Sequence, residues 1–226
     1  MTVTDEIDTV GVTPAPKRRT PVKKATTTTE DNVSITIPAM DLKRVRIPLL
    51  GTAPLIIHKW SEKAKEMMLN KQTQKASTGR EAKDPHQDYR DSLYIINGTE
   101  DPQHLENEQY GFPCVGFKAA AVRAGTYSEM KMTFLRGAFH VRGEFARIMG
   151  TPNMREDMVR IGMGKADIRY RGEFKEWETT LDVEFNAKAI SLEQLFNLFE
   201  IAGFAVGVGE WRPERDGSYG TFKVKS

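Results

Sequence analysis

Residues 191–205, SLEQLFNLFEIAGFA, contain the clearest helix of the chain and both of its boundaries. Ser191 followed by Gln194 is the sequence of a capping box, in which each side chain bonds the backbone of the other residue. Leucine and phenylalanine recur at helical spacing, which predicts one apolar face. Gly203 stands where the helix should end. We predict a helix over 191–203.

On the N- and C-terminal sides of this helix, hydrophobic alternation and glycine boundaries predict the rest of a compact domain. The further elements, in chain order, are a strand over 43–50, a helix over 116–125, strands over 133–141 and 177–187, and a closing strand over 220–225. With the helix over 191–203 the order is β-α-β-β-α-β, which is the ferredoxin-like α+β order. We expect one such domain over 35–226, with insertions near 52–110 and 142–176.

The first strand and the N-terminal residues have distinct patterns. KRVRIPLLG, residues 43–51, alternates basic and apolar side chains with a period of two, which indicates a half-buried strand. Pro48 limits it to a sheet edge or a strand end. Residues 1–34 are rich in threonine and basic residues and poor in large apolar ones, so we expect a disordered tail.

Composition bounds the partners and the compartment. The chain has 226 residues, a formal net charge of +2 and one cysteine, so it forms no internal disulfide. It has no apolar run of about 18 residues that could span a membrane and no signal-peptide pattern, so we expect a cytoplasmic protein of a bacterium or an infected host cell. Lys118 to Lys175 is basic and the segment 176–226 is acidic, which suits anion binding or head-to-tail stacking; an ordinary solvated surface is the alternative.

The closing loop, GVGEWRPERDGSYG over 207–220, combines glycines with cations and aromatic rings. Glycines let backbone N–H groups approach a phosphate. Arg212 and Arg215 can neutralise phosphates, while Trp211 and Tyr219 offer flat faces to unpaired bases. The alternative is a structural turn in which Trp211 packs on the core.

Residue types that would carry catalysis or bind a metal are sparse. His58 is conceivable as a general base, but it has no second acid or base partner nearby. One cysteine and scattered histidines give no zinc set, and the spacing of Asp84, Asp88 and Asp91 matches no standard calcium loop. The chain lacks a GxxxxGK[ST] phosphate loop. We predict no catalytic residue, no metal and no cofactor.

Three stretches resemble a known family. They are VRIPLLGTAPLI, GFPCVGFKAAAVRA with its Pro113 and Lys118, and LEQLFNLFEIAGFAVGVGEWRPERDGSYGTFKV. Together they resemble the repeat-associated mysterious protein superfamily, especially the backbone subunits of class 1 CRISPR effector complexes. The resemblance implies a ferredoxin-like fold, a glycine-rich loop, a grip on single-stranded RNA, lateral assembly into a filament and a thumb-like hairpin, here within 142–176. A stand-alone viral relative is the alternative.

We therefore expect a non-catalytic protein that binds single-stranded nucleic acid and assembles as a homo-oligomer or filament, with RNA favoured by the resemblance. Three alternatives stay open: a viral single-stranded DNA-binding or annealing protein, an endoribonuclease using His58, and a viral structural assembly protein. Charge, stacking faces and glycine backbone select the residues expected to contact nucleic acid: Lys59, Trp60, Lys118, Arg123, Arg136, Arg142, Arg160, Arg169, Arg171, Gly207, Gly209, Trp211, Arg212, Arg215 and Tyr219.

Overall fold

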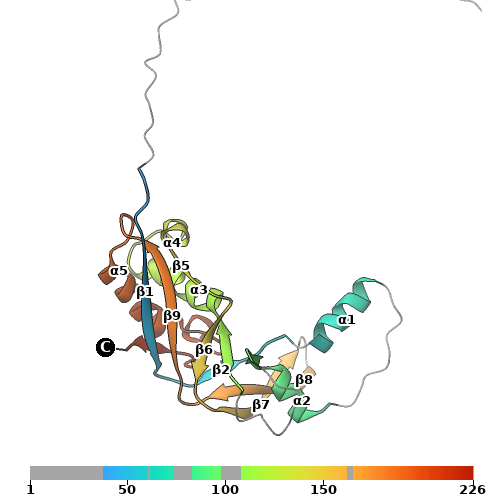
Figure 1. Ribbon diagram of the computed structural model, residues 1–226. Helices are drawn as coiled ribbons and strands as arrows, with labels where there is room; N and C mark the ends of the chain where they lie inside the picture. Colours follow the sequence, from blue (N-terminus) through green and yellow to red (C-terminus); the bar gives the residue numbers. More distant parts are fainter. Residues whose placement is uncertain (1–37, 61, 74–82, 98–107, 162–164, 226) are drawn as a thin grey trace, which may run out of the picture. The chain divides into compact units, whose positions relative to one another are not determined.

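The computed structural model describes residues 38–60, 62–73, 83–97, 108–161 and 165–225. Backbone contacts group the chain from residue 39 onward into one compact unit, which is the unit described below (Figure 1). The tail expected over 1–34 lies outside the described residues.

The described unit is α+β, as predicted. Its strands are β1 (Leu42–Gly51), β2 (Leu55–Ile57), β3 (Tyr94–Ile95), β4 (Tyr110–Pro113), β5 (Phe139–Val141), β6 (Phe145–Met149), β7 (Pro152–Ile161), β8 (Lys165–Phe174), β9 (Glu178–Asn186) and β10 (Phe222–Val224). Its helices are α1 (Glu62–Gln72), α2 (Pro85–Asp91), α3 (Cys114–Ala124), α4 (Met132–Ala138) and α5 (Leu192–Ile201), with short helical turns η2 (Gly125–Tyr127), η3 (Ala202–Val206) and η4 (Pro213–Arg215).

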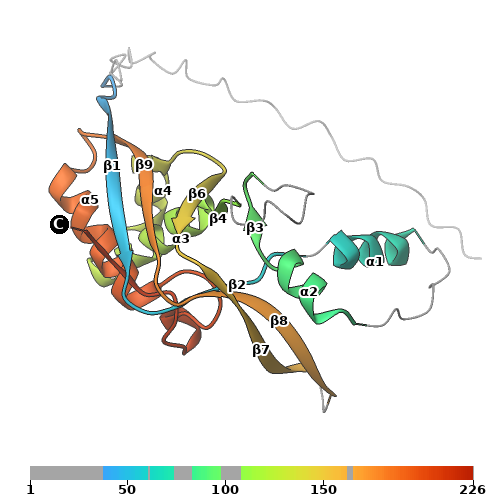
Figure 2. The same cartoon turned by 60° about the horizontal axis from the view of Figure 1, so that its bottom comes forward.

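The main sheet is antiparallel, with strand order β10-β1-β9-β6-β4-β3, and β5 pairs with β9 beside β6. Figures 1 and 2 show α3 and α5 on one side of β1 and β9. Ile47 and Leu49 of β1 and Leu181 and Val183 of β9 are buried in the core on that side. Because side chains alternate along a strand, the other residues of these strands form a second face, which we call the open face.

One predicted strand is wrong over most of its length. Met132–Ala138 is helix α4, and only Phe139–Val141 is extended, as β5. The buried residues of α4, Leu135 and Ala138, lie three residues apart, which is a helical spacing. The strand position that the sequence assigned to 133–141 is shared by β5 and β6, because both pair with β9.

The segment expected to be an insertion near 142–176 contains a long hairpin. Strands β7 and β8 pair antiparallel from Pro152 opposite Phe174 to Ile161 opposite Lys165. β2 adds to the other side of β8, which makes a separate three-stranded sheet (Figure 2). The hairpin is therefore shorter than the predicted insertion, in which Phe145–Met149 forms β6 of the main sheet.

Helix α5 begins as predicted and ends differently. The capping box is present: Ser191 Oγ accepts from the Gln194 backbone N–H at 3.1 Å, and Gln194 Oε1 accepts from the Ser191 N–H at 3.0 Å. The chain does not leave the helix at Gly203 but continues as one π-helical turn, η3, to Val206. A Cβ on Gly203 would lie 1.9 Å from the Phe222 carbonyl oxygen, so this glycine allows close packing against β10.

Helix α2 was missed, although its start is marked in the sequence. Asp84 caps it by accepting from the backbone N–H groups of His86 and Gln87 at 3.0 and 3.2 Å. Pro85 follows at the first helical position, where its missing N–H costs nothing. Aspartate followed by proline was the available signal.

Candidate nucleic-acid interface

The open face carries cations from several strands. Arg44 and Arg46 of β1 are exposed there, since the alternate residues of that strand enter the core. Arg147 of β6 is exposed between the buried residues of its own strand and so lies on the same face. Lys223 of β10 is exposed beside the buried Phe222. Among the residues that the structure describes, the side chains of Arg46, Arg147 and Lys223 have no hydrogen-bond or ion-pair partner.

A carboxylate of β9 neutralises two other arginines of this face. Glu184 accepts from Arg44 Nε at 2.9 Å and also pairs with Arg142. Arg142, a predicted contact residue, is therefore on the open face but already paired. Asp182 lies opposite Arg46 in the strand register, but their side chains form no hydrogen bond or ion pair with each other. The acidic side chains of β9 thus run between two flanks of arginine.

Lys118 and His140 form a cationic cluster with Arg142 beside β5. Lys118 Nζ donates to the Arg136 carbonyl at 3.0 Å and lies 3.0 Å from His140 Nδ1. Burial lowers the pKa of His140, and the charges of Lys118 and Arg142 lower it further. Burial and Arg142 likewise lower the pKa of Lys118. A bound anion would relieve this repulsion.

The closing loop approaches other backbone segments closely. The Val208 N–H donates to the Gly220 carbonyl at 2.9 Å, and the Glu210 N–H donates to the Ile56 carbonyl at 3.0 Å. A Cβ on Gly220 would lie 1.7 Å from the Val208 carbonyl oxygen. On Gly209 it would lie 2.5 Å from the Ile56 carbonyl oxygen. Packing within the protein therefore explains these glycines without a ligand.

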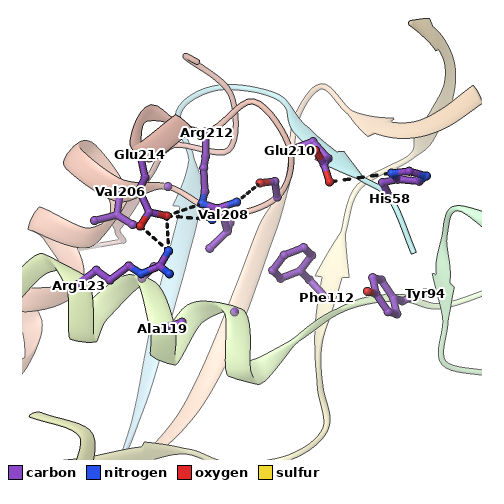
Figure 3. Close-up of a pocket in the computed structure, with 14 residues that line it drawn as sticks. His58, Tyr94, Phe112, Ala119, Arg123, Val206, Val208, Glu210, Arg212 and Glu214 are labelled. Atoms are coloured by element: carbon purple, nitrogen blue, oxygen red, sulfur yellow. Dashed lines mark hydrogen bonds and ion pairs between the residues drawn. The ribbon is translucent and has the colours of Figure 1, made fainter. Parts of the chain in front are cut away.

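The cations of the closing loop are largely bound within the protein. Glu214 pairs with Arg123 of α3 and accepts from Arg212 Nε at 3.0 Å (Figure 3). Arg212 Nη1 also donates to the Gly209 carbonyl at 3.0 Å. Arg215 is exposed and has no side-chain partner among the residues that the structure covers.

The two aromatic residues of the loop differ in accessibility. Trp211 is 45% exposed and has a positive φ of 55°, which a non-glycine residue rarely adopts, so it is not the core residue of the structural alternative. The core tryptophan is Trp177, which is 1% exposed. Tyr219 has one face occupied, since the guanidinium carbon of Arg155 lies 4.9 Å from its ring centroid.

The hairpin places its arginines against its own carboxylates. Arg155 donates to Asp157 at 2.9 Å and to Glu173 at 2.8 Å. Arg171 is only 4% exposed and donates to Asp157 at 3.1 Å, so it cannot reach a ligand in this conformation. Arg169 lies 3.8 Å from Asp167, whereas Arg160 is exposed.

A pocket of about 250 Å³ lies between the closing loop and α3 (Figure 3). It brings together Gly207, Gly209, Arg123 and Arg212 from the predicted set, and His58, which was weighed as a base. His58 Nδ1 lies 4.0 Å from a Glu210 oxygen. Burial lowers the pKa of His58, and the charge of Arg171 adds to this. The ring is therefore neutral at pH 7.

The predicted residues thus fall into three groups. Lys118 and Arg142 border the open face, while Gly207, Gly209, Arg123 and Arg212 line the pocket. Trp211, Arg215 and Tyr219 lie in the closing loop outside the pocket lining, and the remaining members are dispersed. Lys59 and the exposed Trp60 follow β2, Arg136 is exposed on α4, and Arg160, Arg169 and Arg171 are on the hairpin. The sequence interpretation did not include Arg44, Arg46 and Lys223, although the alternation in KRVRIP already placed the first two on the solvent side of a strand.

Neither a metal-binding cluster nor a membrane-spanning helix is present among the residues that the structure describes. Within the described ranges, no group of three or more His, Cys, Asp or Glu side chains could hold a metal ion. In the same residues no helix is long and apolar enough to cross a membrane.

No protein-family model matches the chain, and no curated protein matches its sequence. Among solved structures, the chain matches the crystal structure of Cmr6 from Pyrococcus furiosus with a TM-score of 0.41 and 11% sequence identity. The match covers 83% of this chain and 100% of that one. Cmr6 belongs to the superfamily that the sequence resembles. At this TM-score and identity the likeness establishes neither membership of that superfamily nor a function for this chain.

Proposed function

We propose that the chain is a non-catalytic protein that binds single-stranded nucleic acid across the open face of a ferredoxin-like core. The observation that carries the proposal is the set of exposed cations on that face, with Arg46, Arg147 and Lys223 lacking partners among the described residues. Guanidinium groups bind phosphates in bidentate fashion. RNA is favoured over DNA only by the sequence resemblance, so a DNA-binding protein is an outcome of the test below.

The surface shape of the open face suits an unpaired nucleic-acid strand. Pro48 of β1 lies opposite Thr180 of β9. These short side chains let a flexible strand approach the sheet while the arginines on either side reach its phosphates. The cluster of Lys118, His140 and Arg142 extends the cationic surface beyond β5.

The test is a binding titration by fluorescence anisotropy with a labelled 20-nucleotide single strand, repeated over a range of salt concentrations. Each phosphate contact on a single strand contributes about 0.7 to the slope of log K against log salt. Arg46→Ala combined with Arg147→Ala should therefore flatten the slope by about 1.4. The weaker binding should be similar for strands of different sequence, since phosphates carry no sequence information.

The matched control is Lys131→Ala combined with Lys175→Ala, which removes the same charge from two exposed loop positions outside the open face. An equal flattening in the control would reduce the effect to net charge and remove the open face as the binding surface. RNA, DNA and duplex versions of the strand separate the alternatives. If the protein binds none of the three, a structural assembly protein is favoured.

The same protein and strands also test two other parts of the proposal, the absence of RNA cleavage and the assembly of several copies. We propose that His58 is not a catalytic base, so short RNAs incubated with the protein without metal should remain intact on a denaturing gel. We also propose side-by-side assembly, because Phe204 on η3 is 83% exposed and is available for contact with another copy. Light scattering should then report larger species on longer strands, and a strict monomer on a long strand would exclude a filament.

A further inference from the structure

The pocket between the closing loop and α3 has a shape that the open face lacks. One wall is aromatic, because Tyr94 and Phe112 pack edge to face with ring centroids 6.3 Å apart. The floor is formed by small residues of α3, among them Gly116 and Ala119. The opposite wall is backbone of the closing loop (Figure 3). A slot with one aromatic wall and one thin backbone wall admits a flat ring.

The size and isolation of the pocket also point to a single ring system. Its volume of about 250 Å³ is at the small end for ligand pockets and is too small for a stretch of strand. Gly116 lets the Phe112 ring pack closely on α3, since a Cβ there would lie 2.6 Å from that ring. Ala119 is exposed at the rim, so the pocket opens to solvent on the α3 side.

Glu210 is the group that distinguishes one ring from another. Arg123 and Arg212 are both held by Glu214, which leaves the Glu210 carboxylate without an arginine partner. His58 Nδ1 lies 4.0 Å from a Glu210 oxygen, which is beyond hydrogen-bond distance. The Glu210 side chain is 45% exposed and borders the pocket beside Tyr94 and Phe112. Among the residues that the structure describes, no group donates a hydrogen bond to this carboxylate.

We propose that this pocket binds one unpaired guanine base of the nucleic acid, with the ring against Phe112 and Tyr94 and its Watson–Crick edge on Glu210. A carboxylate only accepts hydrogen bonds and can take two parallel donors. Guanine presents N1–H and N2–H side by side on that edge. Adenine, cytosine and uracil each place an acceptor next to their donor, which a carboxylate repels.

This inference rests on the proposed function, and its test separates the two. Single strands of uridine that carry one central guanine should bind the full chain about fivefold or more tightly than all-uridine strands, since one well-recognised base discriminates by at least that factor. Glu210→Gln should abolish this preference while changing the affinity for all-uridine strands no more than Glu193→Gln does. Glu193→Gln, an exposed carboxylate on α5 outside the pocket, should keep the preference.

A second variant tests the space rather than the carboxylate. Ala119→Leu should fill the pocket from an exposed position on α3, so the fold should survive, whereas Ala119→Ser leaves the pocket open. In ¹H–¹⁵N spectra of the full chain, guanosine monophosphate should shift the amides of Gly209, Glu210 and Ala119 in wild type and Ala119→Ser. Ala119→Leu should abolish these shifts.

Equal shifts with adenosine, cytidine and uridine monophosphates would overturn the guanine assignment. No guanine preference in wild-type strand binding, or one that survives both Glu210→Gln and Ala119→Leu, would overturn the pocket as its source. In either case a flattened salt slope for the Arg46→Ala and Arg147→Ala variant would leave the proposed function standing. Failure of both would remove the two proposals together.

Discussion

On the open face, Arg46 and Arg147 extend from hydrogen-bonded strands into solvent, whereas in the closing loop Arg212 donates to the Gly209 carbonyl and shares Glu214 with Arg123. Both regions are rich in arginine. They differ in what the backbone requires from the side chains.

A strand satisfies its N–H and C=O groups through the sheet, so its solvent-side residues have no structural task. An irregular loop leaves carbonyls that a side chain must satisfy, and Arg212 does this for Gly209. Arginine content alone is therefore a poor guide to a nucleic-acid surface. The better guide is whether neighbouring carbonyls and carboxylates already use the guanidinium.

The largest effect that this comparison predicts concerns stability. Gly220 has φ of +66°, and a Cβ there would lie 1.7 Å from the Val208 carbonyl oxygen. Gly220→Ala should therefore cost at least about 2 kcal/mol of folding free energy, which lowers the melting temperature by roughly 4–8 °C in a domain of this size. Calorimetry measures the shift.

Gly137 on α4 is the matched control, because a Cβ there would meet nothing within 4 Å. Gly137→Ala should leave the melting temperature unchanged or raise it, since alanine is the better helix former. If Gly220→Ala instead melts like wild type but binds nucleic acid weakly, the closing-loop glycines serve a ligand, and the comparison is reversed.

Much of the fold could be predicted from local patterns. The capping box of Ser191 and Gln194 and the alternation of β1 and β9 are properties of short segments, and the structure has them where they were expected. Met132–Ala138 was misassigned because TFLRGAFHV fits both a two-residue and a three-residue spacing. In such a short run the packing partner, not the sequence, decides between strand and helix.

The candidate site was less predictable, because it depends on pairing between distant residues. Nothing local to Arg123 reveals that Glu214 will meet it, and nothing local to Arg171 reveals that it is buried against Asp157. Arg44 and Arg46 were recoverable, since the alternation that identified β1 also fixed the side on which they lie.

The closing-loop arginines should become available to a ligand once Glu214 is neutralised. Glu214→Gln removes the charge that holds Arg123 and Arg212. Both side chains then face solvent or a phosphate, so affinity for a single strand should rise by about two- to fivefold at low salt. Stability should fall slightly, because the two guanidinium groups are close and no longer bridged.

Glu193→Gln makes the same change of net charge away from the loop, and its affinity should rise less. Equal gains in the two variants, measured by the same anisotropy titration, would show that the loop contributes only through the overall charge. A loss of affinity in Glu214→Gln would mean that the bridged geometry itself is what binds.

The smallest effect concerns pH at the β5 cluster. The pKa of His140 lies below its ordinary value of 6.5, so the ring is neutral at pH 7. A phosphate at Lys118, His140 and Arg142 would favour the charged ring and raise that pKa, so binding takes up a proton and affinity increases as pH falls. From pH 7.5 to 5.5 we expect the affinity of wild type to rise about threefold more than that of His140→Gln, whose side chain cannot titrate.

The stability of the fold depends on pH in the opposite direction. Because the pKa of His140 is lowered in the folded state, the free energy of unfolding falls as the pH falls through 6.5. Melting temperatures must therefore be measured at both pH values. If wild type and His140→Gln respond to pH alike, no phosphate lies at this cluster, and the binding surface is confined to the arginines of the strands.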